Sequence, residues 1–155
     1  MIRVQREDFD IGAELDRLAA GKTGIGGVAC FVGVVRDFTD EYGEKGETVG
    51  AITLEHYPGM TERKLEGIEA EARERWPIDA CLIIHRFGRL EPGERIVLVA
   101  TAAAHRKDAI RACEFLIDWL KTEAPFWKLE ETVSGPKWVE ARSSDDDRAV
   151  RWRKK

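Results

Sequence analysis

The sequence predicts an α+β domain in which helices pack on a mixed, largely antiparallel β-sheet. The chain has 155 residues, 43% of them hydrophobic, which is the size of a single domain with one core. Apolar residues repeat with a period of two in some segments and near 3.6 in others. The resulting order, β-α-β-β-α-β-β-α-β-β-α, lacks the regular alternation of a doubly wound fold. We expect one domain over residues 1–144, followed by a charged C-terminal helix or tail at 145–155.

The first half of the chain is expected to hold three strands and two helices. The first helix ends at Gly21, because glycine tolerates the left-handed conformation of a helix C-terminus. Thr61 can cap the second helix, and Pro77 blocks its extension. The segment 27–36 is apolar on both alternating faces and is therefore expected to be a strand buried on both sides. The segment 37–48 is rich in glycine and charge and is expected to be a loop. The predicted bounds are 2–5, 27–36 and 49–57 for strands and 11–20 and 61–76 for helices.

The second half is expected to begin with a hairpin and to end with a helix. The turn-forming residues Glu91-Pro92-Gly93-Glu94 separate two apolar strands. A helix with a wide apolar stripe follows, and Pro125 disfavours helical geometry just beyond it. Two more strands are joined at Gly135-Pro136. The predicted bounds are 80–87, 95–102, 126–133 and 137–141 for strands and 106–121 and 145–152 for helices.

Composition excludes several classes of function. Cys30, Cys81 and Cys113 lie far apart among apolar neighbours, which favours reduced core thiols over disulfides or zinc ligands. The three histidines also lack metal-ligand spacing, so no metal site is expected. The net charge of −4 argues against general affinity for nucleic acid. No apolar run approaches the ~20 residues of a membrane span, and we expect a cytoplasmic protein.

Two groups of cations are candidates for a functional site. His105 and Arg106 begin the helix at 106–121, where cationic side chains and free backbone N–H groups can hold an anion such as phosphate. The alternative is that this pair is an ordinary solvated helix end. Lys121 ends the same helix, and Lys128 follows the bend at Pro125. If these lysines converge, their repulsion and apolar walls from 126–127 favour the neutral amine that a base or nucleophile needs. The alternative is that Lys121 only complements the negative helix end.

Five segments together resemble the large, catalytic subunit of molybdopterin synthase in order and spacing. They are Leu54-Glu55-His56-Tyr57-Pro58-Gly59-Met60, His85-Arg86-Phe87-Gly88 with Pro92-Gly93, Ala104-His105-Arg106, the stretch 121–128, and Trp138-Val139-Glu140-Ala141-Arg142. The resemblance spans nearly the whole chain, from the strand at 31–36 to Arg142. It implies the α/β-hammerhead fold of that family. The segment 37–48 and the tail after Ser144 hold no family signature.

The resemblance also implies a reaction, a partner and a set of site residues. Cyclic pyranopterin monophosphate would receive two sulfurs and become molybdopterin. The sulfur would come from a thiocarboxylate on the C-terminal Gly-Gly of a small ubiquitin-like subunit, and we expect no bound cofactor. Lys121 and Lys128 would be catalytic. The substrate would be held by Arg36, His105, Arg106 and Arg142, with backbone at Val34, Val35, Leu129 and Glu130 as a secondary set.

Two other classes of function are compatible with parts of this pattern. A non-catalytic adaptor could bind the partner tail without the anion-binding residues, and a sensor of phosphate ligands would not need the two lysines. The enzyme hypothesis uses both groups. Because Arg106 and Lys121 are fifteen residues apart on one helix, about 22 Å separates them. We therefore expect a homodimer in which each site takes residues from both chains, and hence a heterotetramer with the small subunit.

Overall fold

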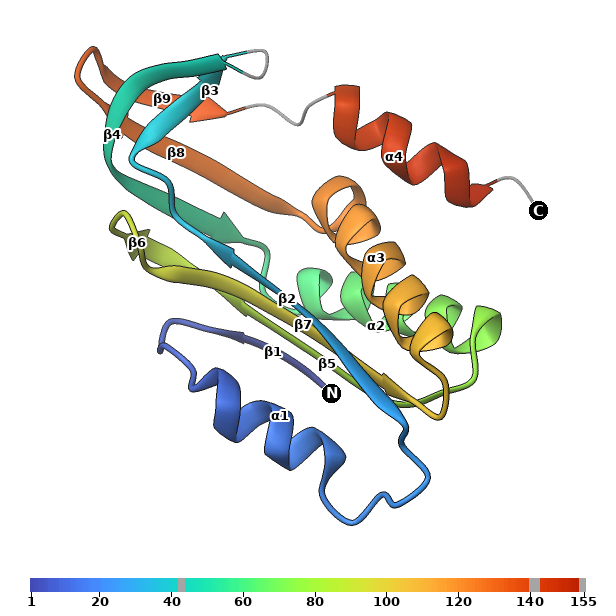
Figure 1. Ribbon diagram of the computed structural model, residues 1–155. Helices are drawn as coiled ribbons and strands as arrows, with labels where there is room; N and C mark the ends of the chain where they lie inside the picture. Colours follow the sequence, from blue (N-terminus) through green and yellow to red (C-terminus); the bar gives the residue numbers. More distant parts are fainter. Residues whose placement is uncertain (42–43, 140–142, 154–155) are drawn as a thin grey trace.

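The computed structural model describes residues 1–41, 44–139 and 143–153 (Figure 1). Its elements follow the predicted order, with two additional short strands. In chain order they are β1 Ile2–Gln5, α1 Ile11–Ala19, β2 Gly27–Val34, β3 Phe38–Glu41, β4 Glu44–His56, α2 Met60–Arg75, β5 Ile78–Arg86, β6 Gly88–Leu90, β7 Arg95–Ala103, α3 Arg106–Glu123, β8 Phe126–Thr132, β9 Gly135–Val139 and α4 Ser143–Arg153. No helix within these ranges has the length and apolar character needed to cross a membrane.

The strands form two sheets, where the sequence predicted one. The first sheet has the order β1-β5-β7-β2, and the second has the order β3-β4-β8-β9, with β6 also paired to β4. The pair β1–β5 is parallel and the other pairs are antiparallel, which confirms the mixed, largely antiparallel character. Figure 1 shows α1 on one face of the first sheet and α2 and α3 on the other. The predicted α+β class is therefore correct.

The main core lies between the first sheet and the helices α2 and α3. Leu65 and Ile68 of α2 and Phe115 and Leu116 of α3 are buried there against apolar residues of β5 and β7. A second cluster on the opposite face joins Phe9 and α1 to the same two strands. The apolar stripe predicted for the helix at 106–121 faces this core in α3, although Ile110, which was predicted to belong to it, is 55% exposed.

The strand β2 corrects one prediction, because it is not buried on both sides. It pairs only with β7 in the first sheet and so forms an edge of that sheet. Val28, Phe31 and Val34 are exposed as a consequence. Cys30 is exposed too, contrary to the predicted core position. Cys81 and Cys113 do lie in the core, where burial raises the pKa of each thiol to about 12 and keeps it protonated.

The predicted loop at 37–48 is also wrong over most of its length. β3 and the start of β4 form an antiparallel hairpin there, in which Phe38 pairs with Thr48 and Asp40 with Lys45. Glycine and charge lower β propensity, but propensity is a weak guide where cross-strand pairing is available. At the other end of β4, the helix α2 begins at Met60 and not at Thr61. Its N-cap is Gly59, whose N–H donates to Glu62 at 2.6 Å.

The C-terminal helix α4 packs against α3. Trp152 is buried among aromatic residues, and its indole N–H donates to the buried Asp118 of α3 at 2.7 Å. Arg151 donates to the same carboxylate at 2.6 Å, so a buried charge is paired. These contacts connect α4 to the C-terminal half of α3, which contains Lys121.

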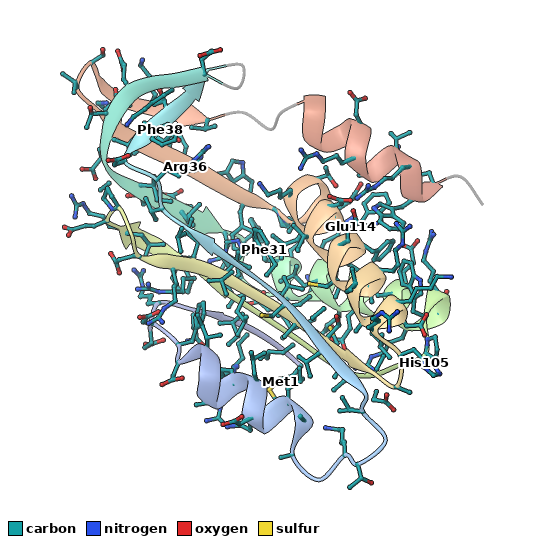
Figure 2. The ribbon with its side chains drawn as sticks, viewed as in Figure 1. Met1, Phe31, Arg36, Phe38, His105 and Glu114 are labelled. Atoms are coloured by element: carbon teal, nitrogen blue, oxygen red, sulfur yellow. The ribbon has the colours of Figure 1, made fainter. Side chains whose placement is uncertain are left out.

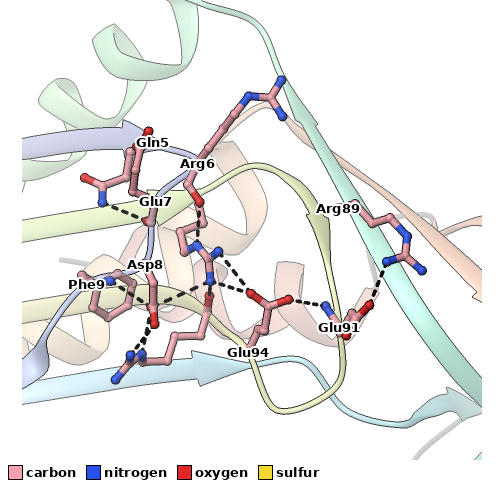
Figure 3. Close-up of polar contacts among 10 residues, drawn as sticks. Gln5, Arg6, Glu7, Asp8, Phe9, Arg89, Glu91 and Glu94 are labelled. Atoms are coloured by element: carbon pink, nitrogen blue, oxygen red, sulfur yellow. Dashed lines mark hydrogen bonds and ion pairs between the residues drawn. The ribbon is translucent and has the colours of Figure 1, made fainter.

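A polar cluster fastens the turn between β1 and α1 to the hairpin of β5 and β7 (Figure 3). The buried guanidinium of Arg86 donates to the carbonyl oxygen of Arg6 at 2.9 Å and to Glu94 at 3.2 Å. Beside it, Arg95 donates to Asp8 at 2.9 Å. That hydrogen bond holds the pKa of Asp8 at about 2, below its ordinary value of 3.8.

The lowered pKa of Asp8 predicts a loss of stability in acid. A carboxylate with a depressed folded-state pKa stabilises the fold above the unfolded value near 3.8, and this contribution disappears as the pH falls towards 2. Asp8 is half exposed, so Asp8→Asn should lower the free energy of unfolding at neutral pH by at most about 1 kcal/mol. Urea titrations from pH 7 to pH 2 measure this. An equal loss in Asp16→Asn, an exposed carboxylate of α1, would show that the pairing with Arg95 is irrelevant.

Candidate functional site

The helix α3 separates the two groups of candidate cations. His105 is its N-cap, and Lys121 lies in its last turn. The rise of an α-helix places these ends about 22 Å or more apart. Figure 2 shows His105 at one end of α3 and Arg36 beside the second sheet, away from it. A single chain therefore does not bring His105 and Arg106 to the two lysines.

The two lysines lie on either side of a sharp junction. α3 ends at Glu123 because Pro125 follows, and β8 begins at Phe126. The hydroxyl of Thr61 donates to the carbonyl oxygen of Pro125 at 3.4 Å and so links the junction to α2. Lys121 is exposed, while Lys128 is partly buried. The junction thus presents one solvated ammonium group and one held against the protein.

Lys128 has a specific partner that the sequence analysis did not assign. Its Nζ lies 2.9 Å from Oε1 of Glu130, whose side chain is about nine-tenths buried. Glu130 was expected to act through its backbone only. The spacing of two residues on one strand could have indicated the pair, because such side chains share a face. The carboxylate therefore holds the Lys128 side chain in one place.

The two aromatic residues that were expected to lie beside the lysines are on opposite faces of β8. Lys128 and Glu130 lie opposite Leu54 and Ile52 of β4, which belong to a buried apolar cluster. Phe126 has the same orientation as Lys128, but Trp127 lies on the opposite face of the strand. Only one of the two expected apolar walls therefore faces the side of β8 that holds Lys128.

The opposite face of the second sheet carries an aromatic groove. Three exposed aromatic side chains, Tyr57, Trp127 and Trp138, line a groove of about 430 Å³ together with Glu55 and His56. Exposed aromatic residues are enriched at surfaces that bind other proteins. No motif in the sequence indicated this groove. The alternation of β8 and β9 places both tryptophans on one face, but pairing of these strands with β4 had to be known first.

Arg36 lies just after β2 and follows Val35, a member of the apolar cluster beside Lys128 and Glu130. The cluster joins Val35 to Ile52 and Leu54, the cross-strand neighbours of Glu130 and Lys128. The guanidinium carbon of Arg36 lies 5.2 Å from the ring centroid of Phe38. Arg36 and the Lys128–Glu130 pair are thus connected through one small core.

Most of the backbone groups that were expected to contact the substrate lie in hydrogen-bonded segments of the chain itself. The N–H of Val35 donates to Glu94, and its carbonyl oxygen accepts from Gly93 at 2.8 Å. Leu129 and Glu130 lie in the central strand β8, which pairs with β4 on one side and β9 on the other. Val34, the last residue of β2, is half exposed. Arg142 lies outside the described residues.

His85 supports the start of β8. Its ring stacks on Phe126 with centroids 3.7 Å apart, and its Nδ1 lies 2.9 Å from the carbonyl oxygen of Arg86. Burial lowers the pKa of His85 to about 4. A histidine that stays neutral at physiological pH adds no charge next to the lysine pair. It therefore serves as a packing residue under the junction.

Comparison with known proteins identifies the family. The model of the family described as MoaE protein matches residues 4–123. A molybdopterin synthase catalytic subunit from Pseudomonas aeruginosa is 57% identical over 97% of both chains. The structure of a molybdopterin biosynthesis MoaE protein from Burkholderia ambifaria is 54% identical, covers 100% of this chain and 99% of that one, and superposes with a TM-score of 0.83. A molybdopterin synthase structure from Staphylococcus aureus is 33% identical, covers 89% and 96%, and has a TM-score of 0.79. The chain therefore belongs to the MoaE protein family.

Proposed function

We propose that this chain is the catalytic subunit of a molybdopterin synthase that acts in the cytoplasm. It converts cyclic pyranopterin monophosphate to molybdopterin with sulfur from the thiocarboxylated C-terminus of a small ubiquitin-like subunit. Family membership supports the reaction. The observation that carries the assignment to a place in this chain is the α3–β8 junction. An exposed lysine lies in the last turn of α3, and a second lysine, paired with a buried carboxylate, follows in β8.

The two lysines have different roles in this proposal. Lys121 is exposed and can approach the acyl group of the partner tail, where it acts as an acid or base or forms a transient covalent bond. Lys128 is paired with Glu130, which fixes the position of its ammonium group. A fixed positive charge stabilises the negative charge that develops on sulfur or oxygen during acyl transfer. Lys128 therefore orients the thiocarboxylate for Lys121.

The remaining cations bind the substrate. Arg36 follows Val35, whose apolar cluster also holds the cross-strand neighbours of Lys128 and Glu130. His105 and Arg106 begin α3, where free backbone N–H groups add to their charge. Arg142, beyond β9, completes the set. Together they provide forked and planar donors that suit a phosphate and a pterin ring.

The length of α3 requires a second copy of the chain. Because His105 and Arg106 are about 22 Å from Lys121, one small substrate cannot contact both ends. A two-fold dimer can bring the Lys121 end of one α3 to the His105 end of its mate and form two equivalent sites. With one small subunit bound at each site, the assembly is a heterotetramer.

A non-catalytic adaptor is the alternative from another class. It would need only a surface for the partner, such as the aromatic groove of Tyr57, Trp127 and Trp138. Incubation with the cyclic precursor and a thiocarboxylated small subunit distinguishes the two. The enzyme releases a dithiolene product that depends on both components. Stable partner binding without product, under conditions in which a known synthase turns over, would support the adaptor.

Substitution of Arg106 by alanine should separate precursor binding from partner binding. The change removes a forked cation at the start of α3, so the dissociation constant of the precursor should rise about tenfold or more. The affinity for the small subunit should stay within about twofold, since the tail is held by the lysines and not by Arg106 in this proposal. Isothermal titration with each ligand measures both. Equal losses for the two ligands would make Arg106 a structural residue.

A further inference from the structure

The hairpin of β3 and β4 places a second cation beside Arg36. The Nζ of Lys45 lies 4.9 Å from the ring centroid of Phe38, and the guanidinium carbon of Arg36 lies 5.2 Å from the same centroid. Figure 2 shows Arg36 and Phe38 next to each other where β2 passes into β3. One half-buried ring therefore contacts two cationic side chains from different segments, in the geometry of cation–π interactions.

The backbone of the hairpin explains this arrangement. Lys45 of β4 pairs with Asp40 of β3, and the register shifts between Asp40 and Phe38. The Nζ of Lys45 reaches the Phe38 ring across this shift. Arg36 precedes Phe38 by two residues and reaches the ring from the link after β2. The ring thus fixes the direction of both side chains, although Arg36 and Lys45 are themselves exposed.

The two positive charges are close enough to act on one ligand. Their distances to the shared ring limit their separation to about 10 Å, roughly one Debye length at 0.1 M salt. Glu47, two residues beyond Lys45 on the same strand, is bound by Lys137 at 2.9 Å and by Ser134. Its carboxylate is therefore already paired. A pair of like charges held on one ring is stabilised when an oxyanion binds to both.

We propose that Lys45 is a further substrate-binding residue, which together with Arg36 binds the phosphate of the substrate, and that Phe38 is the positioning residue for both cations. This inference rests on the proposed function, since it takes Arg36 to be part of the substrate site. It extends that site to the hairpin at 37–48, which has no counterpart among the motifs that indicated the family. Lys45 contributes binding and not chemistry, because it supplies charge to a group that does not accept sulfur.

The test is the KM of the precursor, measured with saturating small subunit in three variants. Lys45→Met keeps an unbranched stem on the Phe38 ring but removes the charge, and should raise KM about fivefold or more with kcat within about twofold. Lys45→Arg keeps the charge and should restore KM to within about twofold. Lys22→Met is the matched control, because Lys22 donates to Leu18 on the α1 side of the first sheet. It should leave KM unchanged.

Inorganic phosphate provides an independent probe. It should inhibit wild-type turnover competitively with the precursor and inhibit Lys45→Met more weakly by the same factor as the change in KM. Phe38→Leu should raise KM in the same way, with a thermal midpoint measured alongside to detect unfolding. Unchanged KM in Lys45→Met while the wild type turns over overturns the inference and leaves the enzyme assignment intact. A rise in the KM of the small subunit instead would mean that the hairpin binds the partner tail. An equal rise in the KM of the precursor in Lys22→Met would mean that the effect comes from the net charge of the protein and not from Lys45.

Discussion

Replacement of Lys121 by arginine is expected to abolish most turnover while the fold survives. Arginine keeps the positive charge but does not give up its proton at physiological pH, so it cannot act as a base or a nucleophile. Lys121 is exposed at the end of α3 and makes no contribution to the core. Loss of acid–base or covalent catalysis at one residue costs a factor of about 100 to 10,000. Single-turnover assays of Lys121→Arg and Lys121→Ala should both show a loss in this range.

A second lysine at the same end of the molecule supplies the control. Lys64 of α2 lies 3.7 Å from Glu123, two residues beyond Lys121. Lys64→Arg should keep near-normal turnover because its role is an exposed ion pair. If Lys121→Arg also kept near-normal turnover, Lys121 would be an electrostatic anchor. The chemistry would then have to be assigned to another group.

Mixing two variants that are each impaired in a different part of the shared site is expected to restore activity. In a shared-site dimer of a Lys121→Ala chain with an Arg106→Ala chain, one site carries both substitutions and the other carries neither. Random exchange makes half of the dimers mixed, and half of the sites in those dimers are intact. Recovery should therefore approach roughly a quarter of wild-type turnover, by symmetry alone.

Native mass spectrometry of the mixture determines whether the result can be interpreted. Once exchange between the two variants is complete, absence of recovery would contradict the shared site. All essential residues would then have to lie within one chain, and the separation of about 22 Å along α3 would need another explanation. Mixtures of each variant with itself are the baseline.

The sequence alone predicted correctly the elements that are determined by neighbouring residues. The periodic apolar stripe and the flanking Pro125 gave α3 to within two residues, and the turn at Pro92-Gly93 gave the hairpin of β5 and β7. The separation of His105 from Lys121 was also predictable, because both lie on one helix. The family resemblance, which depends on motifs and not on pairing, is confirmed by the comparisons.

The remaining features depend on which strands pair, and no local pattern contains that information. The apolar composition of β2 suggested a buried strand, yet its place at the sheet edge exposes Phe31 and Cys30. The hairpin at 37–48 exists because β3 can pair with the extension of β4. The roles assigned to Lys121, Lys128, Arg36 and the α3 N-terminus stay predictions.

Transfer of labelled sulfur tests the central claim most directly. A small subunit whose C-terminal thiocarboxylate carries ³⁴S is incubated with the unlabelled cyclic precursor and this chain, and the product is analysed by mass spectrometry. The account predicts a dithiolene with both sulfurs labelled, and two carboxylate-terminated small subunits for each molecule formed. A product with unlabelled sulfur, or loss of the label without dithiolene formation, would contradict it.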